Sequence, residues 1–310
     1  MSSKSESKRK EKEKEKKSEK ETLKTEPQLS EGKKKKIVYK KIVVDFWATG
    51  LHGEEIGIRQ LEQHRAKSRQ FSKDLDIYGS IIEDGNKVGF VGWRTEAWES
   101  GIDEEPEEEG GEILGPSKAT IGRLVIKAFT NETNWLGTLE EQVALELPRS
   151  HYEPLPVFTI ILPRFEFIIR IERIYSRTGN LYVTSLITKE DKNKKEKIMD
   201  IFEINEKLFT LGSDWVVRRQ NAPKKEIVAE LDGKILNIGG KVEIRIYDEE
   251  LAKNRIFRML LILFAAMTKF HKKVKKKINE VKKQLMRGEI VIKPTHQELE
   301  LMRNPRSIRR

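Results

Sequence analysis

The sequence predicts a mainly β fold, a closed antiparallel β barrel of about twelve strands around a central C-terminal hydrophobic α-helix. Two observations predict it. About a dozen short runs rich in β-branched and aromatic residues lie between residues 37 and 247, with turn residues between them, and such runs are typical of a barrel or a sandwich. One strongly apolar segment, 256 to 267, follows them, and only Arg258 in it is polar. A barrel closed around this helix would remove exposed sheet edges and bury the helix on every side.

The central helix is expected over residues 251 to 270. Its uninterrupted apolar part, 259 to 267, is less than half of the roughly 20 residues that a membrane span needs, and Arg255 and Lys269 flank it. A helix that is apolar all round and too short to span is typical of a protein core. We therefore favour a buried helix over the alternative, insertion into a membrane. Asp248 is a suitable N-cap for this helix.

Two hairpins are the clearest local predictions. Residues 76–82 and 87–93 lie on either side of an Asp-Gly turn, and residues 165–175 and 181–187 lie on either side of Ser-Arg-Thr-Gly-Asn. The strand at 242–247 alternates strictly between apolar and charged residues, as a sheet with one dry face requires.

The remaining strands are predicted from their composition alone. Residues 54–70 are interpreted as a loop or short helix, and residues 188–197 as an exposed connection. The other runs expected to form strands are 37–39, 42–47, 121–129, 143–147, 157–162, 208–212, 214–219, 227–231 and 233–240.

The net charge of +11 belongs to the two ends of the chain. Residues 1–41 contain 16 Lys/Arg and 8 Asp/Glu, and residues 268–310 contain 14 and 4. Residues 42–267 contain 31 Lys/Arg and 38 Asp/Glu, so this part of the chain is mildly acidic. A basic groove for nucleic acid across the folded body is therefore not expected, and the basic ends point to an anionic surface, either lipid headgroups or a polyanion.

Three regions follow from composition. Residues 1–36 are a Lys/Glu-rich segment with too few apolar residues to order itself, so we expect a disordered tail. Residues 37–270 should form the barrel. Residues 271–310 should form a basic extension, which begins with a helix at 271–287 that has a narrow apolar stripe. The lysines predicted to contact anionic lipid or a polyanion are Lys272, Lys273, Lys275, Lys276 and Lys277. The alternative is that this helix packs its stripe, Val274, Ile278 and Val281, on the barrel.

Several classes of chemistry have no support. The absence of cysteine excludes disulfides, thiol catalysis and thiolate metal sites. The chain begins with no signal peptide, so we expect a cytoplasmic location with peripheral membrane contact. The five histidines are scattered, and no nucleotide-binding or nucleophile-elbow motif occurs. We therefore expect no metal, no cofactor and no enzymatic activity.

The acidic run at residues 103–112 has seven acids and no base. We interpret it as a solvated loop, because a block of like charges repels itself. Its acids lack the spacing and central glycine of an EF-hand loop. Contact with one of the basic tails is a further alternative.

The residues from 208 to 270 resemble the closing repeat of the tubby-like, LURP-one-related and phospholipid scramblase superfamily. The matching segments are Leu-Phe-Thr-Leu-Gly-Ser-Asp-Trp-Val-Val (208–217), Ala-Glu-Leu-Asp-Gly-Lys-Ile-Leu (229–236) and Val-Glu-Ile-Arg-Ile-Tyr-Asp-Glu-Glu (242–250), followed by the apolar helix. The resemblance implies a twelve-stranded barrel around a central helix. It also implies binding of phosphoinositides or association with membranes. The phosphoinositide residues of tubby domains have no matching positions in this chain, and scramblase palmitoylation is excluded by the lack of cysteine.

Three hypotheses about function remain open. The first is a non-enzymatic binding module that docks on anionic membrane lipids through the basic ends, and that we expect to be a monomer. The second is a nucleic-acid or ribosome-associated protein whose basic tails contact phosphates. For it, Trp47, Trp93 and Trp98 could stack on bases, although core packing suits their strand-like surroundings better. The third is a protein-interaction scaffold whose lysine-rich tails serve solubility.

Overall fold

The structure is a computed structural model. It describes residues 36–46, 62–65, 74–93, 98, 117–119, 121–132, 134–165, 167–191, 196–208, 214–221, 226–233 and 241–292. The strands and helices in these ranges are β1 (Lys40–Phe46), β2 (Glu62–Arg65), β3 (Asp74–Glu83), β4 (Asn86–Trp93), β5 (Ser117–Ala119), β6 (Val125–Thr130), β7 (Trp135–Glu141), α3 (Val143–Arg149), β8 (Val157–Ile161), β9 (Ile169–Ile174), β10 (Leu181–Asp191), β11 (Glu196–Glu206), β12 (Trp215–Arg219), β13 (Glu226–Asp232), β14 (Lys241–Ile246), α4 (Glu249–Lys253), α5 (Arg255–Thr268), α6 (His271–Met286) and β15 (Ile290–Ile292).

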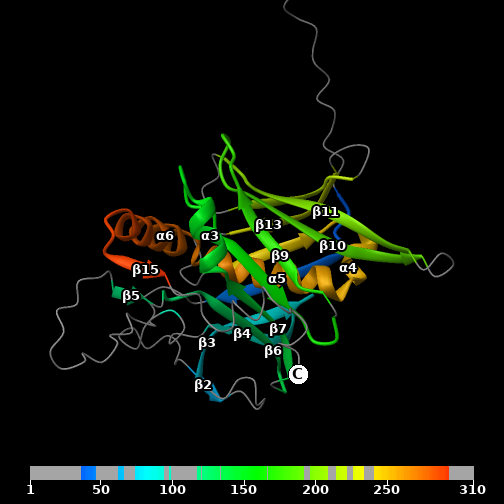
Figure 1. Cartoon of the computed structure of the whole chain (residues 1–310). Coiled ribbons are helices and arrows are strands. Elements are labelled where there is room, and N and C mark those ends of the chain that lie inside the picture. Colours follow the sequence, from blue (N-terminus) through cyan, green and yellow to red (C-terminus); the bar gives the residue numbers. More distant parts are fainter. Residues whose placement is uncertain are drawn as a thin grey trace, which may run out of the picture. The chain divides into compact units, whose positions relative to one another are not determined.

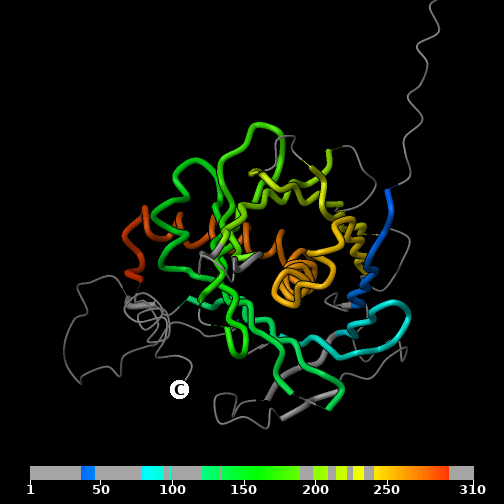
Figure 2. The backbone as a smooth tube through the Cα atoms, turned by 90° about the vertical axis from the view of Figure 1, so that its right-hand side faces the viewer, coloured from blue at the N-terminus to red at the C-terminus, as the bar shows by residue number. Residues whose placement is uncertain are grey.

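Twelve of the strands close into one antiparallel barrel (Figures 1 and 2). The neighbours run β1-β14-β13-β12-β11-β10-β9-β8-β7-β6-β4-β3, and β3 then pairs with β1. This closing seam places Ile42 opposite Glu83 and Phe46 opposite Gly79. β2 pairs with the part of β3 that lies beyond the seam. The predicted closed barrel of about twelve strands is confirmed.

Helix α5 occupies the lumen of the barrel, as the view along its axis shows (Figure 2). Every side chain from Met259 to Met267 is buried. Phe264 meets the rings of Trp215 and Tyr182 edge-on, with centroids 5.3 and 5.4 Å away. Burial of one large apolar side chain contributes roughly 1.5–3 kcal/mol, so this helix supplies much of the core. The choice of a buried helix is confirmed.

The central segment is two helices, so the prediction of one continuous helix over 251–270 is wrong. Asp248 caps α4, because its Oδ1 accepts a hydrogen bond from the N–H of Leu251 at 2.9 Å. Asn254 then adopts extended backbone and starts α5 with a second cap. Its Oδ1 accepts hydrogen bonds from the N–H groups of Ile256 (2.9 Å) and Phe257 (3.1 Å). Asn suits a cap better than a helix interior, because its side chain competes for backbone hydrogen bonds.

Both predicted hairpins are present. The β3–β4 turn has Asp84 at φ 47° and Gly85 at φ 89°, the left-handed pair that suits the twist of a two-residue hairpin. The carboxylate of Asp84 also accepts hydrogen bonds from Lys40 Nζ (2.8 Å) and from the N–H of Lys41 (3.1 Å), so the turn is tied to β1. In the β9–β10 hairpin, Gly179 has φ 111°. The alternation predicted for β14 holds only in part: Val242, Ile244 and Ile246 are buried and Arg245 is half-buried, but Glu243 is buried as well.

The strand predicted at 143–147 is wrong, because these residues form α3. Ala, Leu and Glu favour a helix, and the spacing of three between Val143 and Glu146 places both buried residues on one face of it. The strand of this region is instead β7, which the composition did not reveal. Its last two residues, Glu140 and Glu141, look solvated in the sequence but are fully buried.

Two other predictions change, and one strand was missed. Residues 54–70 contain the short strand β2, and the rest of that range lies outside the described residues. The connection expected at 188–197 is in large part strand, because β10 runs on to Asp191 and β11 begins at Glu196. Strand β11 itself was not predicted. The runs at 209–213 and 234–240, the acidic run at 103–112, the tail at 1–35 and the residues after 292 lie outside the described part of the chain.

Candidate functional site

Helix α6 packs against the barrel beside α3 and β15 (Figure 1). Val274, Ile278 and Val281 are 0, 1 and 7 % exposed, so the apolar stripe is buried. The alternative of a helix packed on the barrel by this stripe is therefore confirmed. The opposite face carries the charge. Because the stripe is already covered, any contact with a surface in this conformation must come from the charged face.

Three of the five predicted lysines lie on the exposed face of α6. Lys272, Lys273 and Lys276 are exposed, and Lys276 forms a loose ion pair with Glu280 at 3.6 Å. Lys283, which the prediction did not include, is exposed on the same helix. The exposed face is therefore strongly basic, and we call Lys272, Lys273, Lys276 and Lys283 the α6 lysine face.

The other two predicted lysines turn toward the barrel. Lys275 Nζ donates to Asn180 Oδ1 at 3.3 Å, and burial, helped by the nearby Arg173, lowers the pKa of Lys275. Lys277 Nζ lies 2.6 Å from Glu141 Oε1 and 2.7 Å from the carbonyl oxygen of Gly122. These two lysines seat the helix on the barrel and are not part of its exposed charge.

Lys277 reaches a buried pair of carboxylates beneath α6. Glu141 ends β7 and Glu146 lies on α3, and neither has any exposure to solvent. Glu141 Oε2 accepts a hydrogen bond from the N–H of Leu124 at 2.7 Å. Burial raises the pKa of Glu146 well above its usual range, and the nearby Glu141 raises it further. The arrangement is therefore a lysine paired with one carboxylate, while the neighbouring carboxyl holds its proton more tightly.

His271, the first residue of α6, is buried among aromatic side chains of the barrel. The His271 ring lies 5.9 Å from the Tyr182 ring and 5.8 Å from the Trp215 ring, measured between centroids. Burial, with the nearby Lys275 and Arg173 adding to it, lowers the pKa of His271 to about 3. Burial raises the pKa of Tyr182 well above its usual range. Both side chains are therefore neutral at physiological pH.

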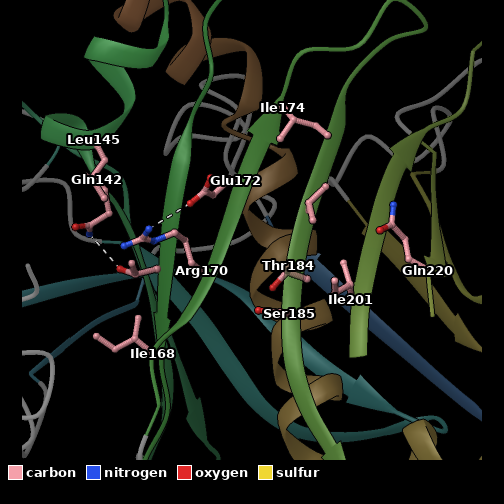
Figure 3. A pocket seen from close by; sticks show the side chains of 12 residues that line it. Gln142, Leu145, Ile168, Arg170, Glu172, Ile174, Thr184, Ser185, Ile201 and Gln220 are labelled. Atoms are coloured by element: carbon pink, nitrogen blue, oxygen red, sulfur yellow. Dashed lines mark hydrogen bonds and ion pairs between the residues drawn. The ribbon is translucent and has the colours of Figure 1, made fainter. Parts of the chain in front are cut away.

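A groove of about 750 Å³ runs over the outer face of the barrel at β8, β9 and β10 (Figure 3). Gln142 and Leu145, at the start of α3, form one wall. Arg170 and Glu172 on β9 form an ion pair at 3.4 Å on its floor. The groove was not predicted, because its lining comes from strands whose outward residues look like ordinary surface positions.

The Glu141 and Glu146 carboxyls lie beneath α6 and have no exposure to solvent, so a substrate would not reach them in this conformation. Among the residues with described positions, no three His, Asp or Glu side chains come together as metal ligands would.

Trp93 and Trp98, two of the three tryptophans proposed for base stacking, are half-buried and pack against the core. The Trp93 ring lies 4.6 Å from the Phe270 ring, and the ammonium of Lys277 lies 4.9 Å from the centre of the Trp98 ring. Trp47 lies outside the described residues. The expectation of core packing is thus confirmed for Trp93 and Trp98.

Comparison of the chain with protein-family models, curated proteins and solved structures found no match. Within the described ranges, no helix combines the length and the apolar character that crossing a bilayer requires.

Proposed function

We propose that the chain is a non-enzymatic binding module that docks on anionic membrane lipids through the α6 lysine face. One observation carries the proposal. The helix is seated on the barrel by its buried stripe and by Lys277, so it holds Lys272, Lys273 and Lys276 together on one rigid, exposed face. Each lysine near an anionic bilayer contributes about 1 kcal/mol, and the attraction fades within a Debye length.

The arrangement of the barrel and its central helix also supports this proposal, because it matches what is expected of the superfamily that the sequence resembles. The tubby-like, LURP-one-related and phospholipid scramblase superfamily is expected to have a twelve-stranded barrel with a hydrophobic helix directly after the last strand. The order β14, α4, α5 in a twelve-stranded ring has that arrangement. Binding of phosphoinositides or association with membranes is what this resemblance would imply.

The mode of binding is electrostatic adsorption without insertion. Amphipathic helices that insert bury an apolar face in the headgroup region, but the apolar face of α6 is already buried against the barrel. Binding should therefore fall steeply as salt is added and should need acidic lipid.

The test is sedimentation with vesicles of phosphatidylcholine containing phosphatidylserine, over a range of salt concentrations. The full chain is compared with a variant carrying Lys272→Glu, Lys273→Glu and Lys276→Glu. Replacement of three attractive charges by three repulsive ones should weaken binding by about 100-fold or more. The matched control carries Lys87→Glu, Arg164→Glu and Lys253→Glu, which change the same net charge at exposed positions outside α6. The control variant should lose far less of its binding to acidic vesicles.

Two outcomes would overturn the proposal. One is an equal loss in the two triple variants, which would mean that net charge alone drives binding. The other is an absence of binding to acidic vesicles at low salt. The nucleic-acid alternative is tested with the same proteins by titration with RNA. It would be favoured if RNA binding were tight, fell steeply with salt and persisted when acidic vesicles did not bind.

A further inference from the structure

The outer groove lies where two neighbouring strands of the barrel wall separate. β10 has 11 residues, but it pairs with β9 only from Leu181, opposite Ile174, to Thr184, opposite Ile171. Beyond Thr184, β10 continues to Asp191 with β11 as its partner on the other side. In the part of the chain that the structure describes, no strand pairs with the β9 side of β10 from Ser185 onward.

A strand edge of this kind presents unpaired main-chain N–H and C=O groups. Proteins usually cover such edges, because an added strand can pair with them. Recognition of extended peptides often uses this geometry: main-chain hydrogen bonds supply affinity, and pockets for alternate side chains supply selectivity. Here the edge and the groove lie together, because Thr184 and Ser185 line the groove (Figure 3).

A buried hydroxyl at this point has no protein partner. Thr184 is 3 % exposed, and its Oγ1 has no hydrogen-bond partner among the described residues. Buried hydroxyls nearly always have a partner, since an unpaired one costs about 1–3 kcal/mol. Thr184 is also the last residue of β10 that pairs with β9. Its neighbours Tyr182 and Leu186 and its cross-strand partners Ile171 and Phe202 belong to the core, so the Thr184 side chain lies on the inner side of the wall, at the point where the two strands part.

The lining of the groove indicates an uncharged occupant. Its charged side chains are already paired: Glu172 lies 3.4 Å from Arg170 and 2.8 Å from Arg149. Gln142 is also engaged, because its Nε2 donates to Thr159 Oγ1 at 3.1 Å. The rest of the lining is hydroxyl, amide and aliphatic, with Ile168, Val183, Ser185, Ile201 and Gln220 among it (Figure 3). The volume of about 750 Å³ lies within the usual range of ligand sites.

We infer that this groove binds an extended, uncharged peptide segment of a partner protein, which adds a strand to the free edge of β10 beyond Thr184. Its main chain would pair with β10, and alternate small or aliphatic side chains would occupy the groove. The site is separate from the α6 lysine face, so the inference does not depend on the membrane proposal.

The test titrates the full chain, with labelled isoleucine and valine methyl groups, with a capped hexapeptide of alternating serine and valine. Saturable shifts are expected at Ile168, Val183 and Ile201. The amide of Ser185 should exchange more slowly with deuterium in the complex, because its N–H faces the free edge and gains a main-chain partner, whereas the N–H of Leu186 faces β11. The matched probe is the same peptide with alternate amides N-methylated, which keeps the side chains but cannot add a strand; it should not bind.

Two protein variants localise the site. Ser185→Arg places a long charged side chain over the groove from an exposed position and should abolish peptide binding. Thr178→Arg makes the same charge change in the exposed β9–β10 turn, outside the groove lining, and should bind as the unmodified chain does.

The inference is overturned if the peptide does not bind, if its shifts lie away from the groove, or if Ser185→Arg binds it normally. Equal binding of the N-methylated peptide would also overturn it. Methyl shifts in the groove with octyl glucoside but not with the peptide would overturn it as well, and would assign the groove to an acyl chain.

Discussion

Lys277 of α6 forms a 2.6 Å ion pair with Glu141 at the end of β7, a carboxylate with no solvent exposure. This contact joins the basic helix to the barrel wall. A charge buried with a partner is tolerated, but it becomes costly when that partner is removed. This buried ion pair therefore helps to hold α6 on the barrel, together with the buried stripe of Val274, Ile278 and Val281.

The first prediction compares the two buried carboxyls. Glu141→Gln should destabilise the protein by about 3–5 kcal/mol at pH 7, because it leaves the ammonium of Lys277 buried without its counter-charge. Urea unfolding followed by circular dichroism measures the change. A loss below about 1 kcal/mol would mean that Lys277 finds enough compensation in the Gly122 carbonyl and the Trp98 ring.

Glu146→Gln is expected to have the opposite effect. The pKa of Glu146 is raised in the folded state by burial and by Glu141. A carboxyl whose pKa is raised by folding lowers the stability of the protein as the pH increases above 4.5, the pKa of the same carboxyl in the unfolded chain. The variant should therefore match the wild type near pH 4 and exceed it by about 1 kcal/mol or more at pH 8. Unfolding midpoints at both pH values check this, and a variant less stable at pH 8 would contradict it.

The second prediction concerns acid. Burial and neighbouring cations lower the pKa of His271 from 6.5 to about 3. Between these pH values the imidazole is protonated in the unfolded chain and neutral in the folded chain. Stability should therefore fall as pH decreases from 6.5 toward 3, with this residue accounting for roughly 2–3 kcal/mol at pH 4.5. His271→Phe should flatten that part of the curve of unfolding free energy against pH. An unchanged slope would show that the acid sensitivity lies elsewhere.

The third prediction concerns the break between α4 and α5. Asn254→Ala should cost about 1 kcal/mol, because the N–H groups of Ile256 and Phe257 lose their acceptor. Asn254→Asp keeps an acceptor at the same place and should restore most of the stability. Thermal unfolding of both variants provides the comparison, and equal losses would argue against a capping role.

The fourth prediction uses two glycines with different requirements. A Cβ at Gly89 in β4 would lie 2.0 Å from the carbonyl oxygen of Phe129 in β6, so Gly89→Ala must push the strands apart and should cost about 3 kcal/mol. Gly85 has φ 89° and open space around it, so Gly85→Ala meets only backbone strain of about 1 kcal/mol. Urea midpoints rank the two, and the reverse order would contradict the close approach of β4 and β6.

The barrel was predictable because its inner faces follow simple rules. β14 alternates, β3 and β4 meet at an Asp-Gly turn, and the apolar run of α5 is too short to span a membrane. The elements that were missed break those rules for local reasons. Glu140 and Glu141 are buried in β7 because cations from distant parts of the chain, Arg123 and Lys277, approach them.

The candidate site was predictable only in part. Lysine density on residues 271–287 identified the basic helix, and its spacing identified the buried stripe. Which lysines face outward depends on how the helix is rotated against the barrel, and this is set by contacts with Glu141 and Asn180. The outer groove depends on where β9 and β10 part, and a list of strands does not reveal that position.

The position of α5 in the chain also governs the order of synthesis. The ribosome makes all twelve wall strands before Arg255, and β1 obtains its partner β14 only after about two hundred residues have emerged. The apolar inner faces of the strands therefore have no helix to pack against until α5 has been made. Such long-range pairing slows folding and exposes apolar surface on the way. A chain that stopped before Arg255 would lack the helix that fills the barrel, so the barrel can be completed only after Arg255–Thr268 has been made.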